Sequence, residues 1–557
     1  MSDKIRIFAL GGLDEDGKNC TVVEINGDIF VVDCGIKYPD KTMPGIDYVI
    51  PNFQYLKDRK DKVKAYFISH GHDDQMGALA YLYKDVPAPI YGSLVTLAMF
   101  KSFSRHVGID PSHYDLHIVE ATSTFMVAGR KISFFRTAHN IAMSSGIAIS
   151  SDKGNIIFTS DFVVENNANP NYLHDMNAIA KIAEDPTLVL LSESVYASHA
   201  GYTAPDYKLT PIIEQTVKDA PGRVFVALFS ANFYNIDEVI ALAISTRKKI
   251  IPYDEETAET ISNMQNCGQL LIPRENFAPI DDLNRYRAQD IIVLMLGYGV
   301  RLYGKIALLA AGQNETKQVM LNATDTFISA CPSNDNTEIE ATDSLDELYR
   351  SGCTVLNVPK KHFLKMHASE EDLKMMIALL KPTYYIPIKG FYKDLLGNAE
   401  VALSMGINLN HSNVFLLENG LSCLFDETGG HLMNEGIVHG DILIDGIGVG
   451  DVGAQVINDR EKLSQGVVIL AATVSKSSRK IVAGPDVQIR GLVFLKDSDA
   501  ILRDVSKIFL TTLNDDLASA PYDVNKIRDD VYDKCLRAIR RQTGKEPMVL
   551  PLIIEIA

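Results

Sequence analysis

The segment ISHGHDDQMG at residues 68–77 carries the side chains best suited to hold a metal ion. His70, His72 and Asp74 alternate within it, directly after the apolar run at 63–69. This spacing lets two imidazoles converge on one ion while the carboxylate faces a neighbouring ion, and Zn²⁺ and Mn²⁺ accept both ligand types. The alternative is a polar loop with solvated histidines. The position of HxHxD immediately after a strand favours the metal site.

Two further candidate ligands follow predicted strands later in the chain. His139 comes after the run KISFFRTA, and Asp161 comes after the run NIIFTS. Each residue alone is more typical of a structural role. In this order and spacing, however, the two residues and the first loop resemble the metallo-β-lactamase fold. That fold uses HxHxDH, then a His, then a bridging Asp and then a final His.

A mixed sheet packed with helices is the arrangement we expect around these residues, with a second α/β unit beginning at residue 204. In these two parts we expect a strand at 4–10 and, after a turn, another at 22–32, with further strands at 63–69, 131–136, 155–160, 187–192, 223–229, 248–252 and 291–296, and helices at 76–83, 211–219, 235–246 and 254–265. In the remainder we expect strands at 354–359, 383–390, 466–474, 488–495 and 549–556, and helices at 369–380, 499–512 and 523–542.

The composition is that of a globular protein. The chain has 557 residues, 46% of them hydrophobic and 22% charged, which suffices for several buried cores. No stretch approaches the ~18 consecutive apolar residues of a membrane helix, so we expect no membrane partner. Seven cysteines, never spaced as CxxC, argue against a disulfide framework and a structural zinc finger, and favour a reducing cytoplasm. The net charge of −17 argues mildly against non-specific nucleic-acid binding, because phosphate affinity comes from clustered Lys and Arg.

The resemblance extends over essentially the whole chain. The inserted unit looks like a β-CASP domain, the mark of nucleic-acid-processing members of the fold. The segments HASEEDLK at 367–374, GDILIDGIGVGDVG at 440–453 and PMVLPLIIEI at 547–556 are similar to the ribonuclease J family. The resemblance implies an α/β chain with a metallo-β-lactamase αββα sandwich, an inserted β-CASP α/β domain and a small α+β C-terminal domain. It places the sandwich at 1–203 and 356–446, the β-CASP domain at 204–355, a linker at 447–464 and the C-terminal domain at 465–557.

Members of this family are bacterial cytoplasmic nucleases that mature and degrade RNA by 5′-to-3′ exonucleolytic and endonucleolytic cleavage. The resemblance implies hydrolysis of phosphodiesters with two metal ions. It also implies catalytic roles for Asp74 and His367. One metal site keeps all its ligands, which are His70, His72, His139 and Asp161.

The second site departs from the family. It would use Asp74, Asp161 and two histidines, but Gln75 and Lys389 stand at the histidine positions. The resemblance therefore implies at most one well-formed site for Zn²⁺ or Mn²⁺, with or without a bound ion. A protonated lysine has no lone pair for a metal. We hypothesise that the Lys389 ammonium neutralises the two carboxylates as the lost cation did; the alternative is an exposed lysine on a decayed loop.

The segments that bind RNA in the family are also altered. Active members hold the phosphate with HxSGH, which corresponds here to Phe363, Leu364, Lys365, Met366 and His367. Only the last histidine is kept, although Lys365 still offers a point charge. The Gly-rich segment expected after the strand at 291–296 has lost its polar groups, and SES at 192–194 replaces SDS. Ser230 and Asn232 resemble a nucleotide-contacting turn of the family.

This pattern of losses resembles the second ribonuclease J paralogue of Gram-positive bacteria, which is weakly active or inactive alone and assembles with the active one. One hypothesis is therefore a ribonuclease with residual, Mn²⁺-supported activity. The other is a non-catalytic RNA-binding subunit that forms homodimers or heterotetramers with an active ribonuclease J paralogue. A small-molecule hydrolase is disfavoured, because it would not need a β-CASP insertion to cover an RNA channel.

Overall fold

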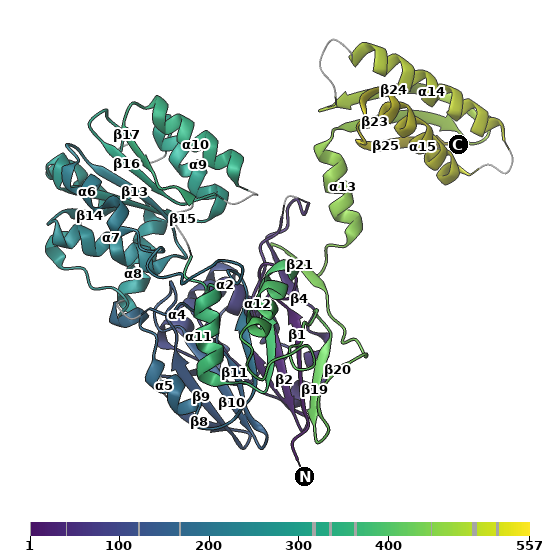
Figure 1. Ribbon diagram of the computed structural model, residues 1–557. Coiled ribbons are helices and arrows are strands. Elements are labelled where there is room, and N and C mark those ends of the chain that lie inside the picture. The colour runs from purple at the N-terminus through teal and green to yellow at the C-terminus, as the bar shows by residue number, and fades with distance from the viewer. Residues whose placement is uncertain are drawn as a thin grey trace. The chain divides into compact units, whose positions relative to one another are not determined.

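The computed structural model describes residues 2–40, 42–120, 123–165, 169–314, 319–333, 337–360, 365–446, 448–492, 498–519 and 523–557. The chain forms two compact units, shown in Figure 1. The first combines Met1–Tyr38 with Val49–Ile442, and the second combines Pro39–Tyr48 with Leu443–Ala557.

The first layer of the sandwich is an eight-stranded sheet with the order β20-β19-β1-β2-β3-β5-β6-β7. Its early strands are antiparallel, whereas β3, β5, β6 and β7 run parallel to one another. The strands are β1 (Ile5–Gly11), β2 (Cys20–Ile25), β3 (Asp28–Val32), β5 (Val63–Phe67), β6 (Ile90–Gly92), β7 (Leu116–Ile118), β19 (Ser422–Asp426) and β20 (Gly429–Met433).

The second layer is a six-stranded sheet with the order β18-β12-β11-β10-β9-β8. The strands are β8 (Thr124–Val127), β9 (Arg130–Arg136), β10 (Ser145–Ser151), β11 (Gly154–Phe158), β12 (Thr187–Glu193) and β18 (Tyr384–Ile388). Strands β11, β12 and β18 are parallel neighbours, so their carboxyl ends lie at one edge of the sheet. Apolar side chains from both sheets form the core between them, including Ile7, Val23, Phe67, Phe134, Ile147 and Val189.

Helices cover the outer faces of the sandwich. The second sheet is covered by α5 (Met176–Ile182), α11 (Glu370–Leu380) and α12 (Tyr392–Ser404), whose apolar residues share a core with β10 to β12. On the first sheet, α4 (Leu94–His106) packs against β6 and β7. The predicted αββα sandwich is therefore confirmed. The helix expected at 76–83 is instead two short helices, α2 (Asp73–Met76) and α3 (Leu79–Leu82). Gly77, between them, packs closely against Ile36 and Phe103.

The inserted unit is a five-stranded parallel sheet with the order β14-β15-β13-β16-β17. Its strands are continuous apolar runs because helices cover both faces. The strands are β13 (Val224–Phe229), β14 (Lys249–Pro252), β15 (Ile291–Gly297), β16 (Thr326–Ala330) and β17 (Thr354–Asn357), and the helices are α6 (Thr210–Asp219), α7 (Phe233–Ser245), α8 (Glu255–Asn266), α9 (Gly299–Ala310) and α10 (Glu338–Arg350).

One buried carboxylate joins the two places where the chain passes between the sandwich and the inserted unit. Asp372 is completely buried near the start of α11. It accepts hydrogen bonds from the backbone N–H groups of Val164 at 2.9 Å, Thr203 at 3.0 Å and Ser369 at 3.0 Å. Because Thr203 lies on the outgoing passage and Ser369 on the returning one, Asp372 fixes both beside the sandwich.

The second compact unit contains a three-stranded sheet with the order β24-β23-β25. Its elements are β23 (Val467–Ser475), β24 (Lys480–Arg490), β25 (Met548–Ile556), α13 (Ala454–Ser464), α14 (Ser498–Ala518) and α15 (Val524–Thr543). Strand β24 begins well before the expected 488–495, and residues 493–497 of that prediction lie outside the described residues. Helix α13 lies within the expected linker at 447–464, and the domain boundaries stay predictions. No helix in the described part of the chain is long and apolar enough to cross a membrane.

Candidate metal centre

The candidate ligands lie in the loops that follow strand ends of both sheets. Strand β5 leads into the loop with His70 and His72, β9 leads to His139, and β11 leads to Asp161. Because β11 and β18 flank β12 in parallel, the loops after these strands lie at one edge of the second sheet. The fold therefore positions Asp161 and Lys389 beside each other, although 228 residues separate them in sequence.

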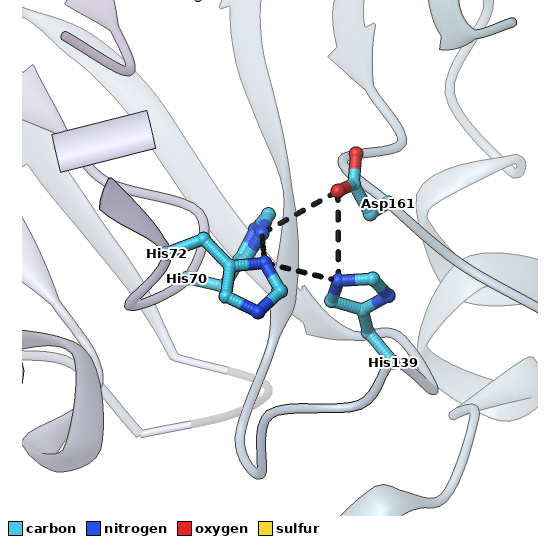
Figure 2. Close-up of side chains that lie close together, drawn as sticks. All are labelled: His70, His72, His139 and Asp161. Atoms are coloured by element: carbon cyan, nitrogen blue, oxygen red, sulfur yellow. Dashed lines mark hydrogen bonds and ion pairs between the residues drawn. The ribbon is translucent and has the colours of Figure 1, made fainter. Parts of the chain in front are cut away.

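Three imidazoles and one carboxylate converge on a single position (Figure 2). The Nδ1 atom of His72 lies 3.0 Å from His70 Nε2 and 3.3 Å from His139 Nε2. The Asp161 Oδ2 atom lies 3.5 Å from the Nε2 atoms of both His70 and His139. All four atoms lie within 4.8 Å of one another. Nitrogen lone pairs that face each other repel unless a cation lies between them, so this donor set fits one divalent ion.

Hydrogen bonds on the far side of each ring select the nitrogen that faces the centre. His139 Nδ1 lies 2.6 Å from the Met366 carbonyl oxygen, and His72 Nε2 lies 3.1 Å from that of Ala231. A carbonyl only accepts, so both nitrogens carry the proton and leave the opposite nitrogen with a lone pair. His70 Nδ1 lies 3.1 Å from Ser160 Oγ.

The histidines are held in the form that binds metal. Burial lowers the pKa of His70 to about 3, and it also lowers the pKa values of His72 and His139. All three rings therefore stay neutral at ordinary pH, as a metal-binding imidazole must be.

The neighbouring position holds an ammonium group. Lys389 is 8% exposed, and its Nζ contacts Asp161 Oδ2 and lies 3.1 Å from Asp74 Oδ2. Burial alone would lower the pKa of Lys389, but the two carboxylates raise it. Burial alone would raise the pKa values of Asp74 and Asp161, but the ammonium holds both below their usual range. Lys389 and Asp161 therefore form a buried ion pair, and the half-buried Asp74 pairs with the same ammonium group.

Gln75 completes this network. With its amide nitrogen turned toward Asp74, it donates to Asp74 Oδ1 at 2.6 Å and to Oδ2 at 2.8 Å. Its oxygen then accepts a hydrogen bond from Lys389 Nζ at 2.9 Å. Asn19 Nδ2 also donates to Asp74 Oδ2, at 3.0 Å. An ammonium cannot accept a hydrogen bond, so only this orientation of the amide suits both neighbours.

A glutamate–histidine pair lies on the other side of Asp161. His367 Nδ1 lies 2.6 Å from Glu193 Oε2 and 3.8 Å from Asp161 Oδ2. The other oxygen of Glu193 accepts hydrogen bonds from the N–H groups of Phe162 at 2.7 Å and Ala368 at 3.1 Å. Glu193 is absent from the predicted site, although the SES segment at the end of its strand is the signal that could have identified it.

Comparisons with known proteins agree with this architecture. Family models match as "Metallo-beta-lactamase superfamily" over residues 13–173, "Ribonuclease J, beta-CASP domain" over 221–345 and "Ribonuclease J C-terminal domain" over 455–556. Ribonuclease J2 of Bacillus subtilis (strain 168) is 32% identical over 557 residues, which covers 100% of this chain and 99% of that protein. This chain belongs to the ribonuclease J family.

Other relatives agree with the assignment to the ribonuclease J family. Ribonuclease J 2 of Streptococcus pyogenes is 32% identical over 559 residues, covering 100% of both chains. The crystal structure of a protein of unknown function from Enterococcus faecalis V583 shares the fold, with a TM-score of 0.50 and 14% identity over 77% of this chain and 100% of that chain. The predicted family and fold class are confirmed.

The predicted RNA-binding residues of this ribonuclease J family member differ in their burial and in their hydrogen bonds. Asn232 caps α7 by accepting a hydrogen bond from Asn235 N at 3.1 Å. Ser230 Oγ is buried and has no hydrogen-bond partner among the described residues. Met366 is buried and supplies the carbonyl for His139, whereas Lys365 is exposed. Phe363 and Leu364 lie outside the described residues, so their predicted roles stay predictions.

Proposed function

We propose that this ribonuclease J family member binds RNA and one divalent ion and hydrolyses RNA only weakly by itself. The observation that carries the proposal is the convergence of the ligand atoms of His70, His72, His139 and Asp161 on one position. A bound Mn²⁺ or Zn²⁺ would supply charge stabilisation at the phosphate and an activated water. With one ion in place of two, the loss of several kcal/mol of stabilisation would lower the rate by several powers of ten.

The chain's own proton-transfer group in this proposal is His367. Glu193 binds its Nδ1, so Nε2 is the nitrogen that remains to give a proton to a leaving oxygen or to take one. Asp74 is the other predicted catalytic residue, but its carboxylate is bound by Lys389, Gln75 and Asn19. We therefore assign proton transfer to His367 alone. The exposed Lys365, two residues before it, would attract an RNA phosphate.

The test is an assay on 5′-monophosphorylated RNA with Mn²⁺, using protein free of any co-purifying paralogue. We expect slow cleavage that disappears in the variant His70→Ala, His72→Ala. Lys365→Ala should weaken RNA binding while the bound ion is kept. If wild type and the double-alanine variant are equally inert, weak catalysis is wrong and the second function below applies.

The second candidate function is that of a non-catalytic subunit that binds RNA and assembles with an active paralogue. The second compact unit supports assembly, because β25 leaves Leu552, Ile554 and Ile556 exposed by 51%, 59% and 42% on one face. A row of exposed apolar side chains on one strand is typical of an interface between proteins. We propose that a second copy of this chain covers it.

Light scattering after size-exclusion chromatography tests that interface. Wild type should elute as a dimer, and Leu552→Asp, Ile554→Asp should elute as a folded monomer. Recovery of the dimer in the variant would exclude β25 as the interface. If wild type is monomeric but forms a complex with an active paralogue, the second copy is wrong and the paralogue is the partner.

A further inference from the structure

We infer that the Lys389 ammonium stands in place of a second metal ion, so that this chain is built for one ion per molecule. The inference rests on the proposed function, because it assumes that the three histidines and Asp161 hold the other ion. It concerns the half of the centre that contains Asp74, Gln75 and Lys389, whose side chains do not form a ligand set for a metal ion.

The position of the ammonium is the first step. Nζ of Lys389 lies against one oxygen of Asp161 and 3.1 Å from one oxygen of Asp74. These are the two carboxylates that would face a second cation. Lys389 and Asp161 are packed inside the protein, where a charge is stable only when it is paired, and Asp74 is half-buried beside them. A second divalent ion would therefore meet a positive charge already bound to both of its remaining ligands.

Gln75 is the second step. Its amide nitrogen satisfies Asp74, and its oxygen satisfies the Lys389 ammonium. A neutral imidazole at this position would offer one N–H, whereas the Gln75 amide nitrogen donates to both oxygens of Asp74 while its oxygen accepts from Lys389. Gln75 and Lys389 therefore form one complementary replacement.

The backbone around Lys389 supports a fixed placement of this charge. Lys389 directly follows β18 and has a φ of 59°, in the left-handed region that non-glycine residues seldom adopt. Its carbonyl oxygen accepts a hydrogen bond from the N–H of Ser194 at 3.2 Å, at the end of the neighbouring strand β12. The two strand ends thus direct the side chain inward, which excludes an exposed lysine on a decayed loop.

The test counts ions per chain by elemental analysis after dialysis against Mn²⁺ and removal of free metal. We expect one ion in wild type and two in Gln75→His, Lys389→His, with either single change staying at one. A folded double variant that stays at one ion, or a wild type that holds two, would overturn the inference.

A second measurement removes the charge without adding a ligand. Lys389→Met should have a lower Tm in EDTA than wild type, and Mn²⁺ should raise its Tm by more than it raises the Tm of wild type. Arg223→Met is the matched control, because Arg223 is a buried cation on the buried Asp325 of the inserted sheet. This control should also lose Tm in EDTA, and Mn²⁺ should raise its Tm only by as much as it raises that of wild type. Equal responses of the two variants to Mn²⁺ would refute the role of Lys389.

The variant His70→Ala, His72→Ala separates the two proposals. If wild type binds no ion and responds to Mn²⁺ no more than the double-alanine variant does, the proposed function fails. Selective rescue of Lys389→Met by Mn²⁺ would then still support the ammonium as a replacement for a cation.

Discussion

The two halves of the centre share Asp161 and the segment that follows β5, yet they carry positive charge in different ways. In one half, His70, His72 and His139 offer lone pairs and are kept neutral by burial. In the other half, Lys389 carries a permanent positive charge between two carboxylates. The difference indicates that the Asp74 half holds its positive charge without a metal ion. In the proposed function, a bound ion would supply the charge of the histidine half and could exchange with solvent, whereas Lys389 cannot.

The largest effect should come from the residue that both halves share. Asp161→Asn leaves Lys389 buried with one carboxylate fewer and removes a ligand from the histidine half. Breaking a buried ion pair costs about 3–5 kcal/mol, which urea unfolding of the metal-free protein would measure. The double variant with Lys389→Met should recover part of that loss. Additive losses would show that the two groups do not depend on each other.

A somewhat smaller loss of stability is expected when the histidines that would bind the metal ion are replaced. In His70→Ala, His72→Ala the stabilisation of the wild type by Mn²⁺ should vanish. At a concentration 100 times the dissociation constant, that stabilisation is about 2.7 kcal/mol. Thermal unfolding with and without Mn²⁺ measures it. A variant that still gains this much would show that the histidines do not hold the ion.

A histidine outside both halves tests whether burial alone keeps rings neutral. Burial lowers the pKa of His174 to about 4, and neither ring nitrogen has a partner among the described residues. The unfolded chain, with a pKa near 6.5, binds the proton first, so stability should fall as the pH falls from 6.5 toward 4. The loss at pH 5 should be about 2 kcal/mol. His174→Phe should flatten this dependence in urea titrations, and an unchanged slope would contradict burial as the cause.

The smallest change concerns Gln75. Gln75→Ala removes the amide from Asp74 and Lys389 but leaves their ion pair intact. Hydrogen bonds to charged groups contribute about 1.5–3 kcal/mol to stability. Because the long Lys389 side chain can shift to recover part of this loss, we expect the free energy of unfolding in urea to fall by about 1 kcal/mol. A loss of stability as large as that of Asp161→Asn would show that the Gln75 hydrogen bonds, and not the ion pairs of the carboxylates, contribute most to the stability of this network.

Much of the sandwich could be predicted from its sequence, because strands such as 131–136 and 187–192 are short apolar runs with polar residues at their ends. The same rule located His70, His139 and Asp161. The Glu193–His367 pair could not be derived this way, since it depends on how β12 and the returning passage meet. The contact of Ala231 with His72 could not be predicted from the sequence either, because it is made by a backbone carbonyl group, which every residue type has.

The hydrogen bond from His72 to Ala231 has a mechanical consequence. Ala231 belongs to the inserted unit, whereas His367 sits on the passage that Asp372 fastens to the sandwich. Any displacement of the insert that breaks the bond to Ala231 would free His72 to turn or to change its protonated nitrogen, while His367 stays anchored to Glu193. All four ligands of the ion belong to the sandwich, so retention of the ion would depend on the insert through this one hydrogen bond.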